Sequence, residues 1–126
     1  MGFVVLGSSA VIAQAPVPVD CQTTSKACLQ EWADYYAEIW NINKDTFFKT
    51  IQGESGWSEN PKGWNDGGRA YGILQFHQGT FDSFSKLCNI PGEYKNPIDQ
   101  LDIGACAFSL GLQSHWTAYR NIHGTK

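Results

Sequence analysis

The sequence predicts a single α+β domain that is mostly helical and carries one small extended element. The chain has 126 residues, which is enough for one domain of ordinary size and too few for two. Apolar residues make up 42% of the chain and charged residues 17%, so the chain can bury a hydrophobic core. Most of it has the apolar spacing of amphipathic helices, whereas residues 71–76 form a short apolar run typical of extended structure.

The first two expected helices lie in the N-terminal half of the chain. One is expected over residues 27–40, because its apolar side chains recur at helical spacing and form a face that should point to the core. That face consists of Trp32, Tyr35, Tyr36, Ile39 and Trp40. The next helix is expected to have Asp45 as its N-cap and to end at residues 53–56, where the sequence Gly-Glu-Ser-Gly breaks the pattern.

Two more helices are expected in the C-terminal half. The first should be capped by Thr80 and should end at Asn89. The second should begin with Asn96 as its cap and Pro97 at its first helical position, a combination favoured at helix starts. Residues 57–69, rich in Gly, Asn and Asp, form a long loop before these helices.

The N-terminal segment is expected to be an export signal. Residues 1–15 are almost all apolar or small and end in a small-x-small motif at residues 13–15, the pattern cleaved by signal peptidase. No Lys or Arg precedes the apolar stretch, so a strand at residues 3–6 is the alternative. With this division, residues 16–26 form an N-terminal segment and residues 27–126 form the folded domain.

The cysteines agree with export. Four cysteines allow three pairings, and we expect the two local ones, Cys21 with Cys28 and Cys88 with Cys106. Four free thiols in a reducing compartment are the alternative. A zinc site is disfavoured because no histidine lies at metal-ligand spacing from the cysteines. The expected location is therefore secreted, periplasmic or in the cell envelope.

Charge and hydropathy exclude two classes of partner. The net charge is −3 and the chain has no block of Lys or Arg, so we expect no nucleic-acid binding. No apolar run reaches the roughly 18 to 20 residues that a transmembrane helix requires, so we expect no membrane span. We expect a monomer.

Glu54 is the first candidate for chemistry. It follows Phe47 and Ile51 at helical spacing, which places its carboxyl group on the apolar face near the C-terminal end of its helix. Desolvation and the negative end of the helix dipole should both raise its pKa toward the range of a general acid. The alternative is a solvated glutamate at a frayed helix end.

The sequence around Glu54 resembles the lysozyme-like lytic transglycosylase superfamily. The resemblance covers roughly residues 47–81 and rests on the segments ESGW, GWNDGG and YGILQF, in that order. The stretch GWNDGGRAYGILQF is most similar to goose-type lysozymes, and ESGWSENPKG is similar to a bacterial transglycosylase pattern. The spacing from Glu54 to Gln75 is close to that of the goose-type enzymes. The resemblance implies a lysozyme-like fold.

The resemblance also implies roles for single residues. Glu54 would be the catalytic acid, and Ser55 would orient it or contact the substrate, although Ser55 is otherwise explained as a polar group at a helix end. Gln75 would donate or accept a hydrogen bond with the sugar, on the N-acetyl side of the muramic residue. Gly72 would let the backbone approach the sugar closely. Tyr71 would contact the substrate or pack in the core.

A second carboxylate is expected only if the enzyme is a hydrolase. Asp66 is the candidate, because it matches the aspartate of the goose-type loop. The alternative is a turn aspartate that caps its own backbone. Goose-type enzymes carry another aspartate two residues after the Gln75 position, and this chain has His77 there instead. This departure disfavours a hydrolase with a well-held water.

The C-terminal segment contains an imperfect form of a transglycosylase motif. Family members have an Ala-Tyr-Asn-like segment whose tyrosine touches the catalytic glutamate, and this chain has Ala118-Tyr119-Arg120-Asn121. Tyr119 is therefore a candidate for substrate binding. Trp116 would be either a stacking platform for a sugar ring or a core residue.

Together these features predict an exported enzyme that cleaves peptidoglycan glycan strands. The resemblance implies attack on the β-1,4 bond between N-acetylmuramic acid and N-acetylglucosamine, with 1,6-anhydromuramic ends as the product. Two alternatives remain, a goose-type-like muramidase and a glycan-binding member of the fold without activity. No cofactor or metal is expected on any of these routes.

Overall fold

The structure of the chain is a computed structural model that describes residues 16–21, 25–58 and 69–123. The expected signal peptide at residues 1–15 and the candidate Asp66 lie outside these ranges. The described residues form five α-helices and one short 3₁₀ helix. These are α2 (Lys26–Ile39), α3 (Lys44–Ser55), α4 (Gln78–Cys88), α5 (Pro97–Ser109), η1 (Gln113–His115) and α6 (Thr117–His123).

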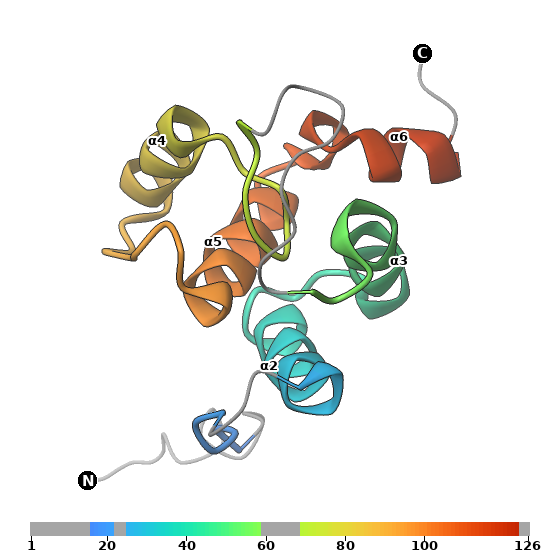
Figure 1. The fold of residues 1–126 in the computed structure, drawn as a ribbon, viewed down its shortest axis with the longest axis vertical. Helices are drawn as coiled ribbons and strands as arrows, with labels where there is room; N and C mark the ends of the chain where they lie inside the picture. Colours follow the sequence, from blue (N-terminus) through green and yellow to red (C-terminus); the bar gives the residue numbers. More distant parts are fainter. Residues whose placement is uncertain (1–15, 22–24, 59–68, 124–126) are drawn as a thin grey trace, which may run out of the picture.

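Helix α5 lies at the centre of the fold, with the other helices around it (Figure 1). It contacts α2 on one side and α4 on another, while α3 packs against both α2 and α6. The α-rich class expected from the apolar spacing is confirmed for the described residues. No helix among them is long and apolar enough to cross a membrane.

The starts of two helices differ from the sequence prediction. Helix α3 is capped by Asn43, whose side chain accepts a hydrogen bond from the N–H of Thr46, and Asp45 lies in the first turn. An acidic residue there still favours the positive end of the helix dipole. Helix α4 begins at Gln78, after an extended His77 that makes no side-chain cap, and not at Thr80. The predicted Asn96 cap and Pro97 start of α5 are confirmed.

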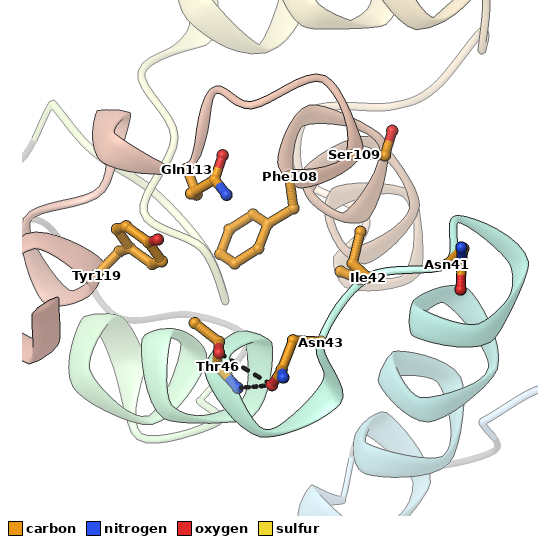
Figure 2. Close-up of a pocket in the computed structure, with 8 residues that line it drawn as sticks. All are labelled: Asn41, Ile42, Asn43, Thr46, Phe108, Ser109, Gln113 and Tyr119. Carbon is orange, nitrogen blue, oxygen red and sulfur yellow. Dashed lines mark hydrogen bonds between the residues drawn. The ribbon is translucent and has the colours of Figure 1, made fainter.

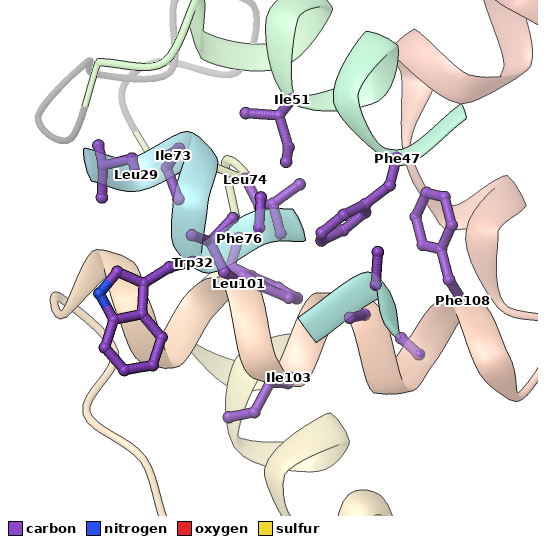
Figure 3. Packing of buried hydrophobic residues seen from close by; sticks show 14 of the residues in the cluster. Leu29, Trp32, Phe47, Ile51, Ile73, Leu74, Phe76, Leu101, Ile103 and Phe108 are labelled. Carbon is purple, nitrogen blue, oxygen red and sulfur yellow. The ribbon is translucent and has the colours of Figure 1, made fainter. Parts of the chain in front are cut away.

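The core is built around α5, which is buried on several sides (Figure 3). Aromatic and aliphatic side chains from α2, α3 and the 71–76 segment pack against it. Gly104 allows the closest of these contacts, because a Cβ at this position would lie only 2.3 Å from Leu74 Cδ1. Eight of the thirteen residues of α5 are buried, which is typical of a central element.

Residues 71–76 form a tight turn and not a strand. Tyr71 and Phe76 make a single antiparallel bridge, with backbone hydrogen bonds of 3.0 and 3.1 Å. Between them, the N–H of Gln75 donates to the carbonyl of Gly72 at 3.1 Å. The described residues thus contain no β-strand where the apolar run predicted an extended element, because the turn reverses the chain before a ladder can form.

Both expected disulfides are present. Cys21 is bonded to Cys28, and Cys88 is bonded to Cys106. The second bridge joins the end of α4 to the buried face of α5 across 18 residues. In the chain-entropy model a loop of this size stabilises a fold by about 3 kcal/mol.

Candidate functional site

Glu54 lies in the last turn of α3 and is held against the start of α6. Its Oε2 accepts a hydrogen bond from the backbone N–H of Ala118 at 2.9 Å. The neighbouring Gly53 makes this contact possible, because a Cβ at that position would lie 2.7 Å from the Cβ of Ala118. Helices α3 and α6 therefore pack very closely at the carboxyl group.

Burial raises the pKa of Glu54 above its ordinary value of 4.5. The hydrogen bond from Ala118 and the positive charge of Arg120 both act to lower the pKa, but burial outweighs them. The direction expected from the sequence is confirmed. Since Oε2 accepts the Ala118 hydrogen bond, Oε1 is the oxygen that would carry the proton of the neutral carboxyl group.

Ser55 is engaged with the end of α3. Its hydroxyl donates to the carbonyl of Ile51 at 3.3 Å and accepts from the N–H of Trp57 at 3.1 Å. Trp57 has a left-handed backbone, with φ of 71°, and its buried ring packs on Phe48 at 5.0 Å. Ser55 thus has the helix-end role that was its alternative explanation, and its contact with a substrate stays a prediction.

Gly72 is required for a different reason from the one expected. A Cβ at this position would lie 2.4 Å from Nε2 of Gln100, and the backbone φ is +86°. The close approach that Gly72 permits is therefore to a side chain of the protein itself. The predicted approach of a sugar to Gly72 is not needed to explain this glycine.

Gln75 and Tyr71 lie at the two sides of the turn. Gln75 has a left-handed backbone, with φ of 51°, and its half-buried side chain donates from Nε2 to the carbonyl of Gly72 at 2.9 Å. The half-buried ring of Tyr71 lies 5.7 Å from that of Tyr94, and Nζ of Lys95 lies 5.4 Å from its centre. Their proposed contacts with a sugar stay predictions.

Gln100 is the residue that sequence analysis missed. It is fully buried on α5, and its Oε1 accepts from the N–H of Leu74 at 3.0 Å. Its Nε2 donates to the carbonyls of Tyr71 at 3.1 Å and Tyr94 at 2.8 Å. A glutamine next to the apolar residues Leu101 and Ile103 of the same helix was the available signal, since a buried carboxamide needs partners of this kind. Gln100 fixes the shape of the 71–76 turn.

Trp116 is a core residue. It is 2% exposed, and its indole N–H donates to the carbonyl of Leu74 at 2.8 Å. Its ring packs against those of Phe76 and Phe108, each with centres 5.4 Å away. The core-packing alternative holds for Trp116, and its ring faces are covered and not available to stack on a sugar.

Residues 116–118 form the junction of the candidate site. Leu74, in the turn, is anchored to the side chain of Trp116, and Glu54 is anchored to the backbone of Ala118. Arg120 braces the same junction, because its guanidinium donates to the carbonyl of Ser114 and to the hydroxyl of Thr117. Three segments far apart in the sequence therefore meet at one place in the fold.

Tyr119 lines a separate pocket at the other end of α3 (Figure 2). Its ring packs edge-on against Phe108, with centres 5.7 Å apart, and Thr46 lies on the opposite wall. The contact with Glu54 is made by the backbone of Ala118, one residue earlier. The predicted role of Tyr119 in substrate binding stays a prediction.

Two histidines lie beside the turn. His77, which replaces the goose-type aspartate, is exposed at the start of α4. Burial lowers the pKa of His115, and the nearby charges of His77 and Arg120 lower it further. His115 also packs against the ring of Phe84 at 5.5 Å.

A second carboxyl group with a raised pKa is structural. Asp102 on α5 is half-buried, and burial raises its pKa. Its Oδ1 accepts a hydrogen bond at 2.8 Å from the indole N–H of Trp40, which follows α2. This bond joins the two helices, far along the chain from Glu54.

Within the described ranges, no group of three or more His, Cys, Asp or Glu side chains is placed to hold a metal ion. Comparisons with protein-family models, with curated proteins and with solved structures found no match. The geometry of the site therefore carries the functional argument together with the sequence motifs. The arrangement offers one carboxyl group with a raised pKa, whose Oε2 is fixed by the backbone N–H of Ala118.

Proposed function

We propose that the protein is a lytic transglycosylase of peptidoglycan. It would cleave the β-1,4 bond between N-acetylmuramic acid and N-acetylglucosamine and leave 1,6-anhydromuramic ends. The observation that carries this proposal is Glu54, whose pKa is raised by burial and whose carboxyl group is held by the start of α6, the same segment that binds the 71–76 turn through Trp116. These three segments are the ones whose sequences resemble the motifs of the lysozyme-like superfamily.

The proposed reaction uses one carboxyl group twice. Glu54 first gives the proton on Oε1 to the glycosidic oxygen, and the bond from that oxygen to C1 of the muramic residue breaks. The carboxylate then accepts the proton of the C6 hydroxyl group, whose oxygen bonds to C1 and closes the anhydro ring. The Ala118 N–H stabilises the charged form between the two steps, because hydrogen bonds to a carboxylate are stronger than those to a neutral acid.

The transglycosylase route is favoured over a muramidase because it needs no second carboxylate. The position of the additional goose-type aspartate is occupied by His77. Gln75 would hold the N-acetyl group of the substrate, and Asp66 would close a turn. A muramidase and a glycan-binding protein without activity are the outcomes against which the proposal is tested.

Export is part of the same proposal. Peptidoglycan lies outside the cytoplasmic membrane, and the two disulfides are compatible with a chain that matures in an oxidising compartment. We place the protein in the secreted, periplasmic or cell-envelope fraction.

The test of the proposal is Glu54→Gln assayed on purified cell-wall sacculi. The amide of the variant still offers an oxygen to the Ala118 N–H, so the fold is retained while the acid is lost. We expect the rate of clearing to fall by a factor of about 10² to 10⁴, the usual contribution of a general acid. The matched control is Glu38→Gln, which changes an exposed glutamate on α2. Normal clearing by Glu54→Gln would refute the proposal.

Mass spectrometry of the released fragments separates the two reactions. Anhydro ends, with Asp66→Asn retaining most of the activity, are the expected result. Ends that can be reduced by borohydride, together with a loss of about a hundredfold in Asp66→Asn, would identify a muramidase instead. Binding to sacculi without any released fragment would identify a glycan-binding protein.

A further inference from the structure

The guanidinium group of Arg120 closes the corner between η1 and α6. It donates from Nη1 to the carbonyl oxygens of Ser114 at 2.9 Å and His115 at 3.2 Å, and from Nη2 to Oγ1 of Thr117 at 3.0 Å. The carbonyl groups at the end of a short helix have no partner inside it, so Arg120 supplies the missing donors at the end of η1. One side chain thereby ties the end of η1 to the start of α6.

The same corner carries the hydrogen bond to Glu54. The N–H of Ala118, one residue after Thr117, donates to Oε2 of Glu54 at 2.9 Å. N–H groups in the first turn of a helix have no acceptor inside the helix, and Trp116, which precedes α6, has no side-chain oxygen that could accept from them. Glu54 is the acceptor instead, so this hydrogen bond depends on where the corner at residues 114–117 lies.

The sequence motifs assign no role to Arg120. It stands between Tyr119 and Asn121, where the family segment has tyrosine followed by asparagine. Its half-buried side chain makes three hydrogen bonds to oxygen, and a planar guanidinium group can direct several N–H groups at once in a fixed fork. A lysine in its place would keep the charge and lose the fork.

Charge provides a second link between Arg120 and Glu54. The positive charge of Arg120 lowers the pKa of Glu54, as does the hydrogen bond from Ala118, although burial outweighs both. The charge of Arg120 also lowers the pKa of His115, on which His77 acts in the same direction. Arg120 therefore acts on titratable groups from two segments, the end of α3 and η1.

We propose that Arg120 is a positioning residue of the Glu54 site. It fixes the corner between η1 and α6, so that the N–H of Ala118 stays on Oε2 of Glu54. In the proposed reaction this N–H must be in place when Glu54 becomes negative after the glycosidic bond breaks. The kinetic role of Arg120 rests on the proposed function, whereas its effect on the carboxyl group does not.

The test compares Arg120→Gln and Arg120→Lys by NMR of the full isotopically labelled chain. Both variants lose the fork, so hydrogen exchange of the Ala118 amide should become at least about tenfold faster, while exchange within α5 should not change. The pH midpoint of the Glu54 carboxyl signal should rise in both variants, and it should rise further in Arg120→Gln, which also removes the charge. The matched control Lys86→Gln removes an exposed positive charge at the end of α4 and should leave both measurements unchanged.

Two results would overturn the proposal. Exchange of the Ala118 amide at the wild-type rate in both variants would show that the corner holds without Arg120, which would then act through its charge alone. Exchange that is faster by the same factor at Ala118 and throughout α5 would show that Arg120 supports the stability of the whole fold and positions nothing in particular.

The pH dependence of sacculus clearing tests the kinetic role of Arg120. Because Glu54 must carry its proton to act as the acid, the rate should fall as the pH rises through its pKa, and in Arg120→Gln this fall should move to higher pH together with the NMR midpoint. His77 and His115 are titrated in the same spectra, and a fall in rate that follows either histidine would refute the kinetic role. If the wild type clears no sacculi at any pH, the proposed function fails, and the exchange and titration results still decide whether Arg120 positions Ala118.

Discussion

Gly53→Ala tests how the candidate site is assembled. In the interior of a helix, alanine is favoured over glycine by about 1 kcal/mol, so this substitution would ordinarily stabilise α3. Here the new Cβ would lie 2.7 Å from the Cβ of Ala118, well inside ordinary contact. To restore contact, α6 must move by roughly 1 Å, which breaks the 2.9 Å hydrogen bond to Glu54.

The expected change follows from three contributions. Overpacking costs about 1 to 3 kcal/mol, and losing a hydrogen bond to a charged group costs about 1.5 to 3 kcal/mol. The gain in helix propensity offsets about 1 kcal/mol of this. The free energy of unfolding should therefore fall by roughly 1.5 to 5 kcal/mol.

Urea unfolding with an unchanged m-value measures this loss. The matched control is Gly79→Ala in α4, where a Cβ would meet no atom within 4 Å, and it should be neutral or slightly stabilising. Adding Ala118→Gly to Gly53→Ala should recover part of the loss, because it removes the other half of the clash. A Gly53→Ala protein as stable as the Gly79→Ala protein would refute the close packing of α3 on α6.

Three other predictions concern stability. Burial raises the pKa of Glu54 in the folded state above 4.5, so the folded chain keeps the proton on this carboxyl group to a higher pH than the unfolded chain does. The stability that this proton contributes is complete below pH 4.5 and is lost as the pH rises through the folded-state pKa. Over that pH range Glu54→Gln should gain stability relative to the wild type, as measured by urea unfolding at several pH values. Gln100→Leu should lower the free energy of unfolding by about 3 kcal/mol, because it removes three hydrogen bonds to backbone groups, one of them to the buried N–H of Leu74, and a loss below about 1 kcal/mol would contradict this role. Replacing Cys88 and Cys106 by serine should cost about 3 kcal/mol, and the untreated protein should be lighter than the reduced one by four hydrogen atoms, as measured by mass spectrometry.

The helices were largely predictable because their signals are local. Apolar spacing located α2, and the Asn96-Pro97 pair located the start of α5 within one residue. The start of α3 was less certain, since Asn43 and Asp45 are both good caps and only the backbone decides between them. Capping preference also failed to predict the start of α4, which follows His77 without a capping side chain and does not begin at Thr80.

The disulfides and the pKa direction of Glu54 were predictable for another reason. With four cysteines, short separations favour local pairs, and both pairs formed. The position of Glu54 after Phe47 and Ile51 is enough to place it on a buried face. Its partner could not be predicted, because a backbone N–H has no sequence signal and Ala118 is 64 residues away.

The turn at residues 71–76 shows where sequence reasoning is weakest. Its apolar residues suggest a strand, but Ile73 and Leu74 are buried by tertiary packing and not by a sheet. The role of Gln100 and the burial of Trp116 both depend on this packing. Long-range contacts of this kind are set by the assembled core, and no periodicity in the chain records them.

The hydrogen bond from Ala118 to Glu54 couples the proposed reaction to the docking of helix α6. Helix α6 has seven residues, too few to be stable alone, so it depends on its contacts with the rest of the fold. In the proposed reaction Glu54 is neutral before the glycosidic bond breaks and negative immediately afterwards. The hydrogen bond from Ala118 to Glu54 therefore strengthens when the leaving sugar departs and weakens when the anhydro ring closes. By reciprocity, undocking of α6 removes this hydrogen bond and raises the proton affinity of the Glu54 carboxyl group. The docking of α6 and the protonation of Glu54 are therefore coupled equilibria.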